Sequence, residues 1–169
     1  MDFRSVFSPT IQDRDAFEDF ADALIDRAPL IERDVARLKK QPQDRELTAD
    51  LFRAIHNIKG DASLCKFDLG IALVHPIESM MSRFRDGEIA FSDLLAELFL
   101  LAIDRLELAT EAVLRGKSVD HLQLPTLVGG LEKLALGQSA EIDTLCAELI
   151  EAVTGFPPVV TDMSSRPTR

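Results

Sequence analysis

The stretch FRAIHNIKG, residues 52–60, has the pattern of an exposed helix segment built around a histidine. At about 100° per residue, Lys59 lies about 60° to one side of His56 and Gly60 about 40° to the other. Ser63 follows two turns later, beneath the histidine. A glycine inside a helix costs about 1 kcal/mol relative to alanine, but its missing side chain lets another molecule approach. This combination suits a histidine that takes up and hands on an anionic group such as a phosphoryl.

The residues on either side of this stretch support the same interpretation. His75 and Glu78 follow His56 by 19 and 22 residues. The motif His-x-Ile-Lys-Gly resembles the mark of a histidine-containing phosphotransfer (HPt) domain. The spacing to His75 and Glu78 is similar to that in the HPt domain at the N-terminus of chemotaxis-type histidine kinases. The likeness extends over roughly residues 10–115, and the segments that carry it are 44–47, 51–53, 75–81, 85–88 and 102–106.

This resemblance implies a role for each residue of the motif. His56 would be the phosphoacceptor, because imidazole titrates near neutrality and its free nitrogen is a nucleophile. Glu78 would hold the other ring nitrogen, in the way that a carboxylate orients a catalytic histidine. His75 would hydrogen-bond to Glu78 or to the phosphoryl, and Lys59 would neutralise phosphoryl charge as a point cation. Three further residues would provide access and docking: Asn57, Gly60 and Ser63.

The resemblance also implies the partners. The phosphoryl group would be exchanged with an aspartate of a response-regulator receiver domain, which would also hold the Mg²⁺, or would come from a sensor histidine kinase. The chain has no glycine-rich phosphate loop, so we expect no ATP site, no kinase activity and no cofactor of its own. The prediction is a phosphoryl carrier in two-component signalling, which is not an enzyme by itself.

Three residues depart from the family pattern and keep a second interpretation open. Lys66 stands where a glycine usually ends the helix, Asp61 adds a negative charge close to the histidine in the sequence, and Pro76 should kink or restart the next helix. These features favour a docking or inhibitory module that binds a receiver or a kinase without transferring phosphate. A third interpretation is a metal site in a helix bundle, with His56, His75 and Glu78 as ligands.

Length and composition limit the class of protein. With 169 residues, of which 46% are apolar, the chain can bury the core of about one domain. The formal net charge of −10 argues against binding to nucleic acid or to an anionic membrane surface. Cys65 and Cys146 fit buried thiols in a reducing compartment. There is neither a run of about 18 apolar residues nor a signal peptide, so we expect a cytoplasmic monomer or weak dimer.

Helical spacing of apolar residues runs through nearly the whole chain, without strong strand alternation. We therefore expect an all-α fold, an up-down antiparallel four-helix bundle with additional terminal helices. Residues 1–115 would form the HPt bundle domain, and residues 116–154 a helical extension packed on it. Residues 155–169 would be a flexible tail or linker.

Local signals predict where the helices begin, break and end. Thr10 would cap the first helix, and Pro29 would break or restart it. Gly129, Gly130 and Gly137 would interrupt the region that follows the bundle. The remaining helices are expected near residues 44–65 or 48–65, 68–86, 93–114 and 142–153, with Thr48, Asp68 and Ser92 as caps.

Overall fold

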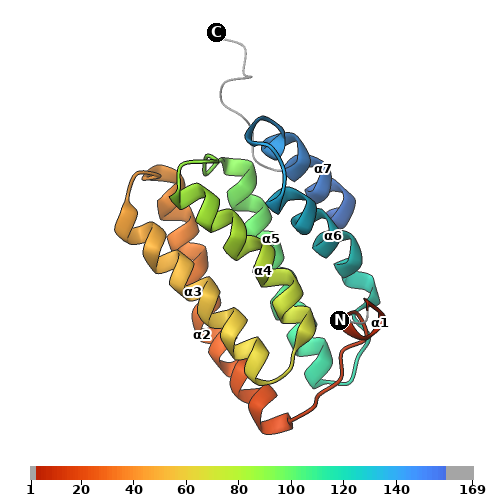
Figure 1. The fold of residues 1–169 in the computed structure, drawn as a ribbon. Helices are drawn as coiled ribbons and strands as arrows, with labels where there is room; N and C mark the ends of the chain where they lie inside the picture. The colour runs from red at the N-terminus through yellow and green to blue at the C-terminus, as the bar shows by residue number, and fades with distance from the viewer. Residues whose placement is uncertain (1–2, 159–169) are drawn as a thin grey trace.

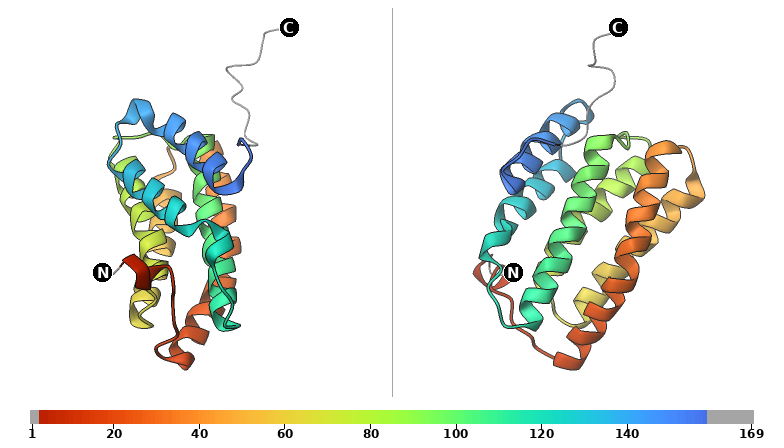
Figure 2. Two further views of the ribbon diagram at one scale, coloured as in Figure 1. Left: turned by 90° about the vertical axis from the view of Figure 1, so that its right-hand side faces the viewer. Right: turned by 180° about the vertical axis from the view of Figure 1, so that it is seen from behind.

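Four long helices form a bundle in the computed structural model, which describes residues 3–158. They are α2 (Arg14–Lys40), α3 (Arg45–Leu64), α4 (Asp68–Arg85) and α5 (Asp93–Leu114). Each helix packs on the next along the chain, and α5 packs back on α2, which closes the bundle. Their directions alternate, with α3 and α4 toward the viewer in Figure 1 and α2 and α5 in front in the right-hand view of Figure 2. The predicted up-down four-helix bundle is confirmed.

The shorter helices lie at the two ends of the chain. They are α1 (Phe3–Val6), the 3-10 helix η1 (Asp120–Leu122), α6 (Leu124–Ala135), the 3-10 helix η2 (Ser139–Glu141) and α7 (Ile142–Thr154). Helix α6 packs against α4, and α7 packs against α5 and α6, so the pair covers one flank of the bundle (Figure 2). A domain boundary near residue 115 stays a prediction, and most of the predicted tail, residues 159–169, lies outside the described residues.

The core face of α3 determines which of its side chains remain on the surface. Leu51, Ile55 and Ile58, spaced three and four residues apart, are almost completely buried among the apolar residues of the bundle. These residues form the core face of α3. His56 and Lys59 lie on the outer side of the same helix, His56 exposed and Lys59 half-buried.

Helix α2 differs from the prediction at its start and at Pro29. Its N-cap is Asp13, whose side chain accepts a hydrogen bond from the Ala16 amide at 3.1 Å, so the predicted cap Thr10 is wrong. The helix then runs unbroken through Pro29. Pro29 and Ile25 are both exposed, and the carbonyl of Ile25, which loses its amide partner to the proline, can bond to water instead. Buried apolar residues of α2 lie both before and after the proline, and their packing keeps the helix continuous.

Other helix starts are predicted to within a few residues. The N-cap of α3 is Asp44, and Thr48 lies inside the helix, buried, with its hydroxyl donating to the Asp44 carbonyl at 3.0 Å. Phe67 takes the N-cap position of α4, so Asp68 is the first helical residue and not the cap. Ser92 caps α5 as predicted. The signals thus place the starts of α3, α4 and α5 to within a few residues but identify the capping residue only for α5.

The end of α3 is a tight turn at Lys66. This residue has φ of 57°, the left-handed conformation that glycine adopts without strain. The Phe67 amide donates to the Ala62 carbonyl at 2.8 Å and the Lys66 amide to that of Ser63 at 3.1 Å, the bonds of a Schellman-type C-cap. The helix therefore ends at Leu64 despite the absence of the usual glycine.

We expect Lys66→Gly to stabilise the protein by about 1 kcal/mol, because it removes the Cβ that crowds a left-handed backbone. Urea denaturation of the variant and the wild type measures the change. Lys66→Ala is the matched control, since it removes the charge but keeps the Cβ, and it should give no comparable gain. Equal stability of all three proteins would contradict the argument from backbone strain.

Helix α6 continues through Gly129 and Gly130, so the predicted interruption at these two glycines is wrong. A Cβ added at Gly130 would overlap the side chain of Leu149 on α7, whereas one added at Gly129 would meet nothing within 4 Å. Gly130 therefore permits the close approach of α7, and Gly129 has no such packing role. Gly137 does lie beyond the end of α6, between the helix and η2.

The two adjacent glycines provide a matched pair of substitutions. Gly130→Ala should destabilise the protein by about 1–3 kcal/mol, because the new methyl group forces Leu149 out of its position. Gly129→Ala should stabilise it by up to about 1 kcal/mol, since alanine is the better helix former at an open position. Thermal unfolding monitored by circular dichroism compares the two. A stabilising Gly130→Ala would show that α6 and α7 pack less closely than described.

Candidate functional site

The carboxylate of Glu78 on α4 joins two side chains of α3. Nδ1 of His56 lies 2.6 Å from Oε2 of Glu78, and Nζ of Lys59 donates to Oε1 at 2.5 Å. The side chain of Glu78 is only 12% exposed and that of Lys59 25%, whereas that of His56 is 59% exposed. The imidazole thus stands at the surface with one edge attached to a carboxylate below it.

This contact determines which ring nitrogen of His56 is available. In a neutral imidazole one nitrogen donates and the other accepts, and a carboxylate selects the form that carries the proton on Nδ1. Nε2 then has the lone pair, and no residue between 3 and 158 makes a hydrogen bond to it. Nε2 is therefore the nitrogen of this imidazole that could act as a nucleophile.

Glu78 remains ionised because of its partners. Burial by itself would raise the pKa of Glu78, but the hydrogen bonds from Lys59 and His56, together with their charges, outweigh it and lower the pKa below its ordinary value. The site therefore keeps a full negative charge beneath the imidazole at neutral pH.

A lowered pKa in the folded state predicts how Glu78 contributes to stability. Its contribution is present above the ordinary carboxyl pKa of about 4.3 and is lost as the pH falls through the lower folded-state value. Glu78→Gln should therefore reduce the free energy of unfolding by about 1–2 kcal/mol at pH 7, and the deficit should shrink in acid. Urea denaturation of both proteins at several pH values between 7 and 3.5 measures this.

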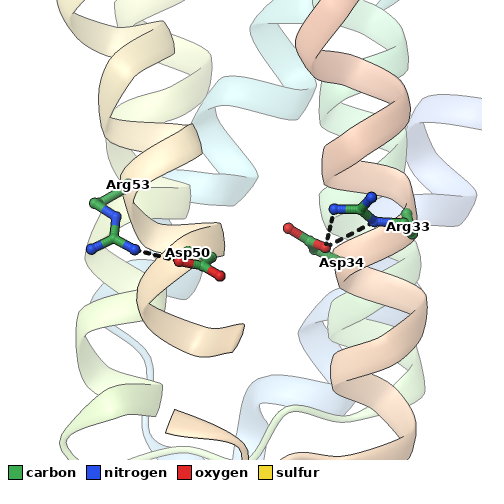
Figure 3. A network of polar contacts seen from close by, with 4 residues as sticks. All are labelled: Arg33, Asp34, Asp50 and Arg53. Atoms are coloured by element: carbon green, nitrogen blue, oxygen red, sulfur yellow. Dashed lines mark hydrogen bonds and ion pairs between the residues drawn. The ribbon is translucent and has the colours of Figure 1, made fainter. Parts of the chain in front are cut away.

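Asp50 offers a control for that experiment. It pairs with Arg53 on the exposed side of α3 (Figure 3), and such surface pairs contribute less than about 1 kcal/mol. Asp50→Asn should therefore leave stability nearly unchanged at pH 7. A Glu78→Gln deficit that is no larger than the control's, or that grows in acid, would contradict the proposed balance of charges.

Two arginines of the neighbouring α2 and α3 surface are each paired with a carboxylate of their own helix, as Figure 3 shows. Arg53, one turn before His56, folds back along α3 to Asp50, and Arg33 of α2 lies against Asp34 on its own helix. Both guanidinium groups are thus held by neighbouring carboxylates. Lys59, in contrast, reaches the carboxylate that contacts the histidine.

Two residues that were not predicted as site residues lie beside this cluster, Phe52 next to the imidazole and Arg85 over the Phe52 ring. The ring of Phe52, one turn before His56 on α3, is nearly parallel to the imidazole, with an interplanar angle of 8° and centroids 6.3 Å apart. The guanidinium carbon of Arg85 on α4 lies 5.2 Å from the Phe52 centroid. The spacing of four residues between Phe52 and His56 could have indicated the first contact. The second depends on how α3 and α4 pack.

The other predicted site residues lie at the surface outside the Glu78 cluster. His75 is exposed, and its side chain makes no hydrogen bond or ion pair with any residue between 3 and 158, so it is not joined to His56 or Glu78. A Cβ added at Gly60 would meet nothing within 4 Å, so the surface there is open. Asn57 and Ser63 are exposed on the same helix.

The two remaining departures from the family pattern leave the Glu78 contact intact. Asp61 is paired with Arg27 of α2, which compensates its charge at the α2–α3 interface. Pro76 is buried within α4, yet the helix runs from Asp68 to Arg85 and presents Glu78 to His56.

Other site classes find no support in the described part of the chain. Among residues 3–158, no three His, Cys, Asp or Glu side chains are grouped so that they could hold a metal ion. Cys65 and Cys146 are buried and unpaired, as predicted, and burial raises the pKa of the Cys146 thiol to about 12. No helix within the same residues is both long and apolar enough to cross a membrane.

Comparison with known proteins points to one family. A family model described as "Hpt domain" matches residues 14–114, more than half of the chain. The chain is 28% identical over 94 residues to the "Sensor histidine kinase CheAY" of Helicobacter pylori, which covers 56% of this chain and 12% of that protein. It is 26% identical over 139 residues to the "Chemotaxis protein CheA" of Rhizobium meliloti, covering 81% and 18%. These matches confirm the predicted resemblance.

This chain matches only a small part of each of these relatives. The "Chemotaxis protein CheA" of Cereibacter sphaeroides is 29% identical over 120 residues, which are 71% of this chain but 17% of that protein. The chain thus spans less than a fifth of the length of these curated relatives. The matched residues, 14–114, contain all four bundle helices and the complete His56–Glu78–Lys59 cluster.

Proposed function

The chain belongs to the Hpt domain family, and from this premise we propose that it is a phosphorelay intermediate that carries a phosphoryl group on His56. The observation that carries the proposal is the contact between Nδ1 of His56 and Glu78, which leaves Nε2 exposed as the nucleophile. The proposed donor or acceptor is an aspartate of a response-regulator receiver domain.

The proposed reaction is a direct exchange between two side chains. The lone pair of Nε2 attacks the phosphorus of the aspartyl phosphate, and a P–N bond forms as the P–O bond to the aspartate breaks. The electron pair of that bond returns to the aspartate carboxylate. The ring gains positive charge during the attack, and Glu78 stabilises it through the proton on Nδ1. Transfer out of His56 is the reverse of this sequence.

Lys59 and Gly60 serve the approach of the phosphoryl group in this proposal. The Lys59 ammonium lies within reach of the same carboxylate as His56, so it places a positive charge next to the incoming phosphoryl oxygens. Gly60 leaves the surface open for the receiver. Any Mg²⁺ that the reaction needs would be held by the receiver's own acidic residues, since this chain would supply only the nucleophile and its supports.

The proposed setting is two-component signalling in the cytoplasm. The printed names of the relatives include a sensor histidine kinase and chemotaxis proteins, so a kinase of that class is a second proposed phosphoryl source. Because this chain spans only a small part of those proteins, the proposal extends to phosphoryl carriage and not to their kinase activity.

The first test is phosphotransfer from a panel of phosphorylated receivers and kinases of the source organism, with wild type and His56→Gln compared. We expect an acid-labile, alkali-stable phosphate on the wild type and none on the variant. Glu78→Gln should slow transfer by about 10²-fold, because it removes the charge that supports the ring. His75→Asn is the matched control and should transfer within about twofold of the wild type, since His75 has no hydrogen bond or ion pair with His56 or Glu78.

Absence of label from every donor, with receivers still bound, would reject the relay. It would support the alternative of a docking module that binds a receiver or kinase without chemistry. Label that persists in His56→Gln would place the phosphoacceptor elsewhere in the chain.

A further inference from the structure

We infer that Phe52, held by Arg85, is a positioning residue that fixes the plane of the His56 imidazole. The inference rests on the proposed function of His56 and adds a second support besides Glu78. It assigns to these two residues a role in orienting the nucleophilic nitrogen, without any contact to the phosphoryl group.

One hydrogen bond does not fix an exposed imidazole. The torsion between Cβ and the ring of histidine is broad, and the side chain is 59% exposed, so most of its surface lacks packing neighbours. The bond from Nδ1 to Glu78 holds one atom of the ring but leaves rotation about that contact. A second contact on the face of the ring is needed to define where Nε2 points.

Phe52 supplies that face contact. Its ring lies parallel to the imidazole within 8°, with centroids 6.3 Å apart, and it comes from the preceding turn of the same helix. A flat neighbour resists tilting of the imidazole in a way that an aliphatic side chain of similar size does not. Glu78 at the edge and Phe52 at the face together restrain both rotations of the ring.

Arg85 holds Phe52 in turn. Its guanidinium lies over the phenyl ring at 5.2 Å, within the range of a cation–π contact. Arg85 and Glu78 are two turns apart on α4 and share a face, just as Phe52 and His56 are one turn apart on α3. Glu78 and Arg85 of α4 therefore contact His56 and Phe52 of α3. These contacts couple the orientation of the imidazole to the register of the two helices.

Orientation matters because in-line attack requires the Nε2 lone pair to point at the phosphorus atom, opposite the P–O bond that breaks. A displacement of about 1 Å in such an arrangement can cost about 10²-fold in rate. A receiver that docks correctly would therefore react slowly with a tilted imidazole, so loss of Phe52 should lower the rate of transfer and not the affinity for the receiver.

The test compares Phe52→Leu, which keeps an apolar side chain but loses the flat ring, with Phe52→Tyr, which keeps the ring. Phe84→Leu is the matched control, because Phe84 packs against Phe91, with centroids 5.4 Å apart, and has no ring contact with His56. Two readouts are needed: ¹⁵N NMR of the His56 ring nitrogens without any partner, and transfer kinetics over a range of receiver concentrations.

We expect Phe52→Leu to shift the ring-nitrogen signals of His56 toward a mixture of the two tautomers. It should also lower the maximal transfer rate about tenfold with KM unchanged. Phe52→Tyr and Phe84→Leu should resemble the wild type in both. Unchanged NMR signals in Phe52→Leu, or an equal shift in Phe84→Leu, would overturn the inference, and an effect on KM alone would make Phe52 a docking residue instead.

The NMR measurement also separates this inference from the proposed function. If the wild type accepts no phosphoryl group from any donor, the relay fails, yet the ring-nitrogen signals still decide whether Phe52 orients the imidazole. If transfer works and the signals do not respond, the relay stands and the positioning role is rejected.

Discussion

The contacts that the Glu78 carboxylate makes require a fixed register between α3 and α4. The rest of the candidate site depends on these contacts. His56 and Lys59 lie one turn apart on α3, and both reach Glu78 from α4. A shift of one residue along either helix would rotate a partner by about 100° and break the cluster. The register is set by the apolar core between the helices and by the tight turn at Lys66. The site is therefore a consequence of how the bundle packs.

The site combines a buried charge with an exposed nucleophile. Glu78 loses most of its contact with water, and its hydrogen bonds to Lys59 and His56 offset that loss well enough to lower its pKa. The carboxylate consequently needs no reorganisation when positive charge develops on the imidazole in the proposed reaction. His56 can remain at the surface because its neighbours lie beneath and beside it: Glu78 at one ring nitrogen and Phe52 next to the ring.

Contacts that repeat with the helical period could be predicted from the sequence, whereas those that depend on packing between helices could not. The core face of α3 and the spacing from His56 to Glu78 follow from periodicity and from the family motif. The sequence predicts that Pro29 breaks or restarts the helix, but the local preference of a proline yields to the apolar stripe that continues on both sides of it. The Arg85–Phe52 contact joins two helices, and no pattern within either segment defines it.

Helices α6 and α7 take part in this arrangement through α4. Arg83 of α4 donates to the carbonyl of Ala135 at the end of α6, at 3.2 Å, and α6 packs along the flank of α4 away from α3. The close approach of α7 at Gly130 makes α6 and α7 a tightly packed pair. These helices therefore brace the helix that supplies Glu78 and Arg85 and leave the α3–α4 face open (Figure 1). Residues outside the family's matched region thus pack directly on the helix that supplies Glu78 and Arg85.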